Sequence, residues 1–309
     1  MEHEGAVVIT TINKYATVRL VPREGKNVTV VGEEGQVARF TLGEELPYDG
    51  KLDLVKAVLN HFKPEGGFEL HLRSEMPTGS GMGTSSSQLV ALIGCVSRFV
   101  GREMSRGEVA ELAYHLEREV LGQKGGYQDQ YAAAFGGFNY MTFFRGKVEV
   151  QPLTLPQELL HALHERLLLF FLGRTRLSGA IHEDIAKRLS SKQGPQLEAL
   201  HELKRLAVEA KDALLRGDLE RFGELLHLGW LNKKMLSPLI TNPELDRIYE
   251  EARRRGALGG KILGAGGGGH FLVFSKAGAQ PELIKLFESI GACLVPFDFE
   301  RGGLEVREL

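Results

Sequence analysis

The sequence is poor in the features that mark disulfide-stabilised, thiolate-metal or membrane proteins. Its 309 residues include two cysteines, Cys95 and Cys293, which lie far apart and outside any Cys-x-x-Cys pair. This predicts neither a disulfide framework nor a thiolate zinc site. The longest clearly apolar run, residues 167–172, is far shorter than the roughly 20 residues that span a bilayer. The acidic start, MEHEG, is not typical of a signal peptide, so we expect a cytoplasmic protein.

An excess of charge of either sign is also missing. The chain has 38 basic and 40 acidic side chains, a formal net charge of −2. Proteins that bind nucleic acid or anionic membranes by electrostatics carry a basic surface, so neither partner is expected. With 43% hydrophobic and 25% charged residues, the composition is that of an ordinary globular protein. An anionic small molecule would therefore need a local binding site.

The order of apolar patterns predicts an α+β protein of two domains, residues 1–155 and 156–309. Short β-branched runs within residues 5–42 predict strands, followed by a helix over 52–62 and a strand over 68–73. A long apolar helix follows a glycine-rich turn.

A third helix in this half begins at the capping box Ser105-Arg-Gly-Glu108, and its apolar face is predicted to run from Val109 to Val120.

The second half of the sequence has a different order of predicted strands and helices. A buried strand is predicted at 167–173 and further strands at 261–264, 270–274 and 293–299, with helices after the first and before the last. Without the additional helices, the order is strand, helix, strand, strand, helix, strand, which is typical of the ferredoxin-like fold.

The segment Pro77-Thr-Gly-Ser-Gly-Met-Gly-Thr-Ser-Ser-Ser87 precedes the long apolar helix. Glycines at alternate positions allow a sharp turn and close approach of the backbone to a ligand. The N–H groups at a helix N-terminus favour phosphate, and the hydroxyl groups can bind phosphate oxygens or Mg²⁺. The segment lacks the Gly-Lys-Ser/Thr of a Walker A loop. A serine-capped surface turn is the alternative, but it would need neither three glycines nor four hydroxyls.

A second glycine-rich segment, Gly264-Ala-Gly-Gly-Gly-Gly269, contains the spacing GxGxxG. A dinucleotide-binding fingerprint opens a helix, whereas residues 270–274, HFLVF, have the pattern of a strand. The segment therefore predicts close approach to a ligand or to the other domain, in preference to a floppy loop.

Asp129 lies between two glutamines in the segment 125–130. A carboxylate held there could accept a proton from a substrate hydroxyl. By spacing alone, a solvated loop aspartate is the more economical interpretation, so the assignment depends on its context.

Together these segments resemble the GHMP small-molecule kinases, over most of the chain. Residues 77–87 resemble the family's second motif, P-x-G-x-G-L-G-S-S-A, with Met82 in place of leucine, and residues 262–274 resemble its third motif. Residues 128–140, 173–178 and 231–269 are most similar to the heptose 7-phosphate 1-kinases, then to L-fucose kinase and galactokinase.

The resemblance implies an ATP- and Mg²⁺-dependent kinase that phosphorylates the anomeric hydroxyl of D-glycero-D-manno-heptose 7-phosphate, with ATP between the two domains. It assigns Asp129 as the base. It assigns Mg²⁺ to Ser85 and Glu117, with Glu119 as the alternative acid. The implied ATP-binding residues are Pro77, Gly79, Ser80, Gly81, Met82, Gly83, Thr84, Ser85 and Ser86. The implied substrate-binding residues are Gln128, Arg176, Lys233, Gly266 and Gly267, of which Arg176 and Lys233 would bind the substrate phosphate.

One family feature is missing from the sequence. The family starts with a strand and a motif like P-x-R-x-x-x-x-G-G-G-T-D, which helps to bind sugar, and residues 2–20 resemble the family's segment immediately after that motif. We expect either a longer natural chain or a variant that compensates. L-fucose kinase or galactokinase, which need no second phosphate subsite, is the alternative enzyme. An inactive nucleotide-binding homologue is the alternative from another class.

Overall fold

The computed structural model describes residues 4–32, 37–173, 179–190 and 193–308. Contacts divide the chain into two compact units that alternate along the sequence. Unit 1 contains the N-terminal segment up to Ile12, Thr78–Met82 and Gly137–Phe299. Unit 2 contains Asn13–Pro77, Gly83–Gly136 and the C-terminal segment from Glu300. The single boundary at residues 155–156 stays a prediction.

Unit 2 is built on a four-stranded sheet in the order β2-β5-β3-β4. The strands are β2 (Ala16–Arg23), β3 (Asn27–Val31), β4 (Val37–Thr41) and β5 (Gly67–Ser74). Strand β5 is antiparallel to β2 and parallel to β3. Phe68, Leu70 and Leu72 are buried on one face of β5, as their alternation predicts.

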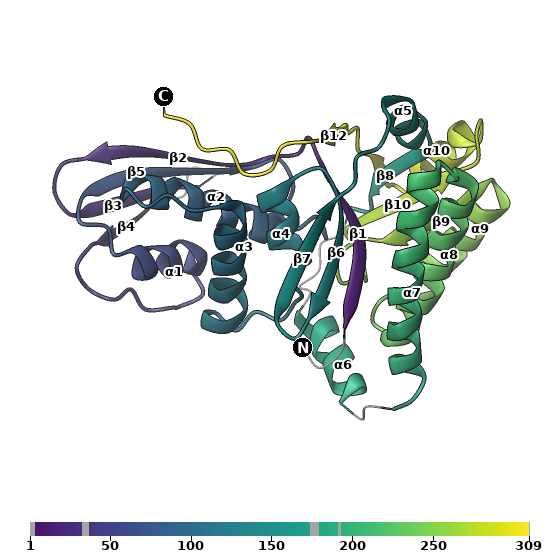
Figure 1. Ribbon diagram of the computed structural model, residues 1–309, viewed down its shortest axis with the longest axis horizontal. Helices are drawn as coiled ribbons and strands as arrows, with labels where there is room; N and C mark the ends of the chain where they lie inside the picture. Colours follow the sequence, from purple (N-terminus) through teal and green to yellow (C-terminus); the bar gives the residue numbers. More distant parts are fainter. Residues whose placement is uncertain (1–3, 33–36, 174–178, 191–192, 309) are drawn as a thin grey trace. The chain divides into compact units, whose positions relative to one another are not determined.

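Helices pack beside this sheet (Figure 1). They are α1 (Asp53–Phe62), α2 (Thr84–Phe99), α3 (Arg106–Tyr114) and α4 (Gln128–Phe135). Helix α2 contacts β2, and α3 and α4 both contact α2. Because α2 is apolar along most of its length, it forms the centre of this helical layer: Leu89, Leu92 and Ile93 are fully buried.

Helix α3 begins at the predicted capping box, in which Ser105 N donates to Glu108 Oε2 at 2.7 Å. After Tyr114 the chain continues as the π-helix η1 (His115–Val120), where Leu121 N donates to Leu116 O, five residues earlier. This wider turn shifts the face that the helix presents to the core. The predicted apolar face is therefore wrong at its end: Val120 is exposed and Glu117 is fully buried.

Unit 1 contains the ferredoxin-like sheet, in the order β11-β8-β10-β9. Its strands are β8 (Leu167–Phe171), β9 (Ala257–Ile262), β10 (His270–Ser275) and β11 (Cys293–Leu294). The neighbouring strands are antiparallel, which confirms the predicted fold class. The last strand is shorter than predicted and ends before Pro296, which has no N–H group to donate to a ladder.

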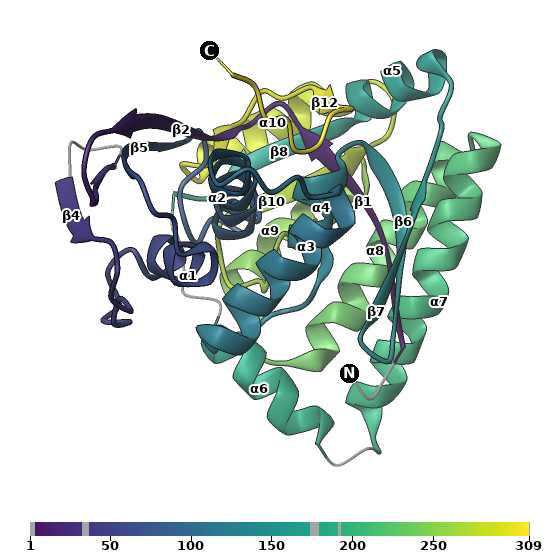
Figure 2. The same ribbon diagram turned by 60° about the vertical axis from the view of Figure 1, so that its left-hand side comes forward.

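The remaining elements of unit 1 complete its core. A second sheet contains β1 (Gly5–Ile12), β6 (Phe138–Phe144), β7 (Lys147–Pro152) and β12 (Phe299–Glu300). The helices are α5 (Gln157–Arg166), α6 (Gly179–Leu189), α7 (Pro195–Arg216), α8 (Leu219–Leu236), α9 (Pro243–Arg254) and α10 (Gln280–Ser289). Helices α7 and α8 lie side by side (Figure 2). Helix α8 also contacts β9. No helix among the described residues is long and apolar enough to cross a membrane.

Candidate active site

The predicted phosphate loop, residues 77–87, has the backbone that its glycines suggest. Gly79, Gly81 and Gly83 have φ angles of 76°, 82° and 70°, in the left-handed region that glycine adopts at little cost. Gly83 is the N-cap of α2 and has no side chain to cap the helix. The first turn of α2 is therefore left with N–H groups that an anion can accept from. Met82 and Thr84 are partly exposed there.

Within unit 1, the Thr78–Met82 arm of this loop lies against the second glycine-rich segment. An ideal Cβ on Gly264 would lie 2.7 Å from Gly81 Cα, and one on Gly269 would overlap Ser80 O. Real side chains do not approach a backbone that closely, so these glycines are required by the packing of one loop on the other. The predicted close approach is thus made, inside this unit, to the phosphate loop itself.

Hydrogen bonds between Ser80 and His270 join the two loops. The backbone N–H of His270 and its Nδ1 both bond to Ser80 O, at 3.1 and 2.9 Å. Because a carbonyl only accepts, Nδ1 carries the hydrogen. Burial lowers the pKa of His270, although the bond to Ser80 opposes that shift, so burial favours the neutral ring. Ser80 was predicted to bind ATP, yet its hydroxyl is fully buried and makes no hydrogen bond within the described structure.

Three predicted substrate-binding residues make contacts that hold the glycine-rich segment in place within unit 1. Gly267 N donates to Ile240 O at 2.8 Å, and a Cβ on Gly266 would lie 2.7 Å from the same oxygen. Lys233 Nζ donates to Ile262 O at 2.8 Å and to Gly264 O at 2.7 Å. Desolvation of the ammonium, with a smaller contribution from the charge of Lys261, lowers the pKa of Lys233. When it is protonated, Lys233 has three hydrogens, one more than these two bonds use.

In unit 2, Glu117 joins η1 to the start of α2. Ser85 Oγ donates to Glu117 Oε1 and Ser86 Oγ to Glu117 Oε2, both at 2.8 Å. Gln130 Nε2 donates to the same Oε2 at 2.6 Å. A carboxylate that is fully buried needs such donors to offset its lost hydration. The structure therefore brings the two predicted metal-binding residues, Ser85 and Glu117, into direct contact.

Asp129 is the second residue of α4 and is half-buried. An ideal Cβ on Gly83 would lie 3.3 Å from both Cβ and Cγ of Asp129, so this side chain packs against the start of α2. Gly83, Ser85, Glu117 and Asp129 thus form one group within unit 2. Gln128 precedes Asp129 on α4 and is also half-buried, and Arg176 lies outside the described residues.

The oxygen atoms at this position fit a magnesium ion. Mg²⁺ is usually held by one or two carboxylates together with substrate phosphates and water. The Glu117 carboxylate and the Ser85 hydroxyl are suitable as the ligands that the protein would contribute. Among the residues that the structure describes, no cluster of three or more His, Cys, Asp or Glu side chains could hold a metal.

Sequence reasoning missed Gln130, although it is fully buried and binds Glu117. A glutamine in an otherwise small and apolar stretch, next to Asp129, was the available signal.

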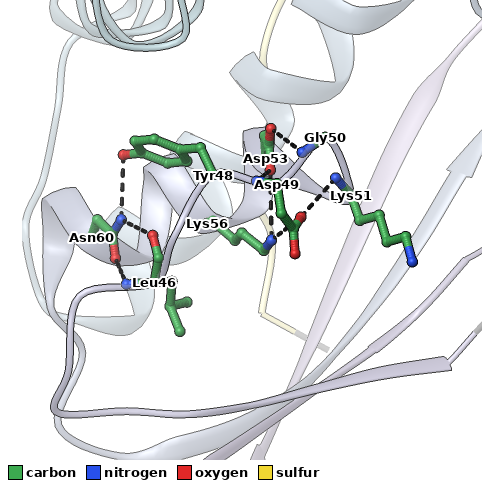
Figure 3. Close-up of polar contacts among 8 residues, drawn as sticks. All are labelled: Leu46, Tyr48, Asp49, Gly50, Lys51, Asp53, Lys56 and Asn60. Carbon is green, nitrogen blue, oxygen red and sulfur yellow. Dashed lines mark hydrogen bonds and ion pairs between the residues drawn. The ribbon is translucent and has the colours of Figure 1, made fainter.

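Sequence reasoning also missed a hydrogen-bonded loop before α1 (Figure 3). Asn60 donates to Leu46 O at 2.9 Å and accepts from Leu46 N at 2.8 Å. The buried Lys56 pairs with Asp49 at 2.5 Å, and Asp53 accepts from Gly50 N at 2.9 Å. Beside this loop is a hollow of ≈ 620 Å³, lined by both acidic and basic side chains.

Comparison with known proteins gives a consistent result. The description "GHMP kinases N terminal domain" matches residues 52–137, and "GHMP kinases C terminal" matches residues 210–288. A D-glycero-alpha-D-manno-heptose 7-phosphate kinase from Campylobacter jejuni is 36% identical over 98% of this chain and 91% of its own. A bifunctional fucokinase/GDP-fucose pyrophosphorylase from Arabidopsis thaliana is 28% identical over 71% of this chain and 21% of its own.

A solved structure is similar over the whole chain. The crystal structure of a D-glycero-D-manno-heptose 1-phosphate kinase from Bacteroides thetaiotaomicron has a TM-score of 0.80 and 28% identity, and the match covers 99% of this chain and 92% of that one. With matching family domains in both halves and a near full-length relative above 30% identity, this chain belongs to the GHMP kinase family.

Proposed function

We propose that this protein is an ATP-dependent sugar kinase that phosphorylates the anomeric hydroxyl of D-glycero-D-manno-heptose 7-phosphate. The observation that carries the proposal is the group in unit 2 in which Asp129 packs against Gly83 and Glu117 bonds to Ser85. It combines a carboxylate, a cation site and an uncapped helix N-terminus, which are the parts that phosphoryl transfer requires. The substrate is proposed from the Campylobacter relative.

The phosphate loop binds the triphosphate of ATP in this proposal. The N–H groups of the first turn of α2 donate to phosphate oxygens, and the partial positive charge of the helix end favours the anion. Gly79, Gly81 and Gly83 keep side chains away from the ligand. Ser85 and Glu117 would hold Mg²⁺, which neutralises phosphate charge when it is bound.

Asp129 aligns the anomeric hydroxyl and takes its proton. The hydroxyl oxygen forms a bond to the γ-phosphorus while the bond from that phosphorus to the β–γ bridging oxygen breaks, so ADP leaves with the electron pair. Since little charge develops on the attacking oxygen in a loose transition state, positioning is the larger contribution of Asp129.

The remaining predicted residues bind the sugar phosphate. Lys233 keeps one hydrogen beyond those that it donates to Ile262 O and Gly264 O, and it would donate this one to the 7-phosphate. Gln128, Gly266 and Gly267 are proposed to contact the sugar. L-fucose and galactose carry no phosphate and would leave this ammonium without its partner, which is the physical basis for preferring the heptose phosphate.

A coupled assay for ADP release tests the proposal. The value of kcat/KM should be higher for heptose 7-phosphate than for unphosphorylated heptose, L-fucose or galactose. Asp129→Asn should lower kcat by about 10²- to 10⁴-fold, the usual worth of a positioned acid or base, and leave ATP affinity unchanged. Full turnover by this variant would remove Asp129 from the mechanism. A higher kcat/KM for L-fucose than for heptose 7-phosphate would make L-fucose the better candidate substrate.

A further inference from the structure

The two oxygens of the Glu117 carboxylate are hydrogen-bonded unequally. Among the described residues, Oε1 accepts from Ser85 Oγ at 2.8 Å. In contrast, Oε2 accepts from Ser86 Oγ at 2.8 Å and from Gln130 Nε2 at 2.6 Å. Arg118 Nη2 also lies 3.5 Å from Oε2. Each carboxylate oxygen has about two lone-pair sites. Oε2 is therefore saturated by protein donors, while Oε1 keeps one site for a ligand beside the Ser85 hydroxyl.

The position of Gln130 involves an energetic cost. Its side chain is fully buried, and its own Oε1 has no hydrogen-bond partner in the described structure. An unpaired buried carbonyl costs about 1–3 kcal/mol. The amide cannot be turned to relieve this cost, because the carbonyl oxygen would then face the Glu117 carboxylate. The bond to Glu117 thus fixes the orientation of Gln130 at the expense of its other polar atom.

We infer that Gln130 is a positioning residue: by holding Oε2, it turns Oε1 of Glu117 toward the bound divalent cation. The inference rests on the proposed function, since it assumes that Glu117 is a ligand of that cation. It also links the helix that carries Asp129 to the metal site, because Gln130 is the next residue on α4. Partners of this kind typically change metal affinity by about 10- to 100-fold when they are removed.

The test measures binding of Mn²⁺, whose free ion is visible by electron paramagnetic resonance. The full chain is titrated with Mn²⁺ in the presence of a non-hydrolysable ATP analogue. Gln130→Met keeps most of the side-chain volume and removes the donor, and it should weaken Mn²⁺ binding about tenfold or more. Gln130→Asn, whose amide is one methylene too short to reach Oε2, should weaken it similarly. Gln151→Met, at an exposed position of β7, is the matched control and should bind Mn²⁺ like the wild type.

Metal affinity distinguishes positioning from simple structural support, which would change the melting temperature alone. Gln130→Asn is the smaller change, so the test remains usable if Gln130→Met does not fold. Wild-type Mn²⁺ affinity in a folded Gln130 variant, combined with weak binding by Glu117→Gln, would overturn the inference and leave the proposed function intact. Wild-type affinity in Glu117→Gln as well would overturn both the inference and the assignment of Glu117 to the metal.

Discussion

Gly81 and Gly264 lie backbone against backbone: an ideal Cβ on Gly264 would be 2.7 Å from Gly81 Cα, and one on Gly81 would be 2.9 Å from Leu263 O. The arm of the phosphate loop in unit 1 is therefore supported by the second glycine-rich segment. His270, at the start of β10, also bonds to Ser80 O beside Gly81. This relationship gives a physical reason for glycines that need not touch any ligand.

Replacing Gly81 tests this packing directly. Gly81 and Gly278 have almost the same φ, 82° and 80°. An alanine at either position should therefore introduce about 1–2 kcal/mol of backbone strain. Nothing lies within 4 Å of a Cβ on Gly278. Gly81→Ala should therefore lower the free energy of unfolding by about 1–3 kcal/mol more than Gly278→Ala, as expected of overpacking. Denaturant titration measures both, and equal losses would show that the contact is unimportant.

Gly83→Ala tests the contact between the helix start and Asp129. A Cβ there would lie 3.3 Å from Asp129 Cγ, so the carboxylate must move by a few tenths of an ångström. We expect kcat to fall about tenfold, since small displacements of reacting groups are costly. Gly101→Ala is the control, because Gly101 has a φ of 72° and no atoms within 4 Å of its Cβ. Identical kcat values in the two variants would argue against the proposed place of Asp129.

His270 should make stability depend on pH. Burial lowers its pKa in the folded state below the ordinary 6.5, so the unfolded chain binds the proton more readily. The free energy of unfolding should then fall as the pH drops below about 6.5. His270→Asn keeps a donor for Ser80 O and removes the titration, so its slope between pH 5 and 6.5 should be smaller. The pKa values of His61 and His227 are also lowered by burial, so these two residues add to the slope of the wild type.

The slope is measured by denaturant titration of the variant and the wild type across this pH range. A His270→Asn slope as steep as that of the wild type would mean that the imidazole is not buried in its neutral form.

Lys233→Met separates loop support from substrate binding. Loss of the ammonium leaves Ile262 O and Gly264 O without a donor, which should cost about 1–3 kcal/mol of stability. If Lys233 also binds the 7-phosphate, KM for heptose 7-phosphate should rise about tenfold, while KM for ATP stays the same. Lys234→Met, which breaks an ion pair with Asp246 at 2.8 Å, should cost at most about 1 kcal/mol. An unchanged KM for the sugar phosphate would limit Lys233 to loop support.

Much of the fold could be predicted because its elements have regular apolar periods. The alternation in β5 is such a period, and the capping box of α3 is a local residue spacing. The order of elements along the second half matches the ferredoxin-like sheet. The π-helix could not be predicted, since its hydrogen bonds follow from packing and not from residue spacing. Consequently, the exposure of Val120 and the burial of Glu117 were both outside the reach of a helical-face argument.

The candidate site was predictable in part. Glycine spacing indicated the phosphate loop, but it could not identify the second loop as its packing partner. Gln128 and Gln130 flank Asp129 in the sequence, and residues two apart lie on different faces of a helix. Spacing alone does not say which of the two turns inward. The structure buries Gln130 against Glu117.

The position of the transferred phosphate is the most direct test of the central claim. Phosphorus NMR of the chain with ATP, Mg²⁺ and D-glycero-D-manno-heptose 7-phosphate should show ADP and a second sugar phosphate signal coupled to the anomeric proton. The Asp129→Asn protein should yield this signal at a rate about 10²- to 10⁴-fold lower. A product phosphorylated elsewhere on the sugar, or no product under conditions in which L-fucose or galactose is phosphorylated, would contradict the account.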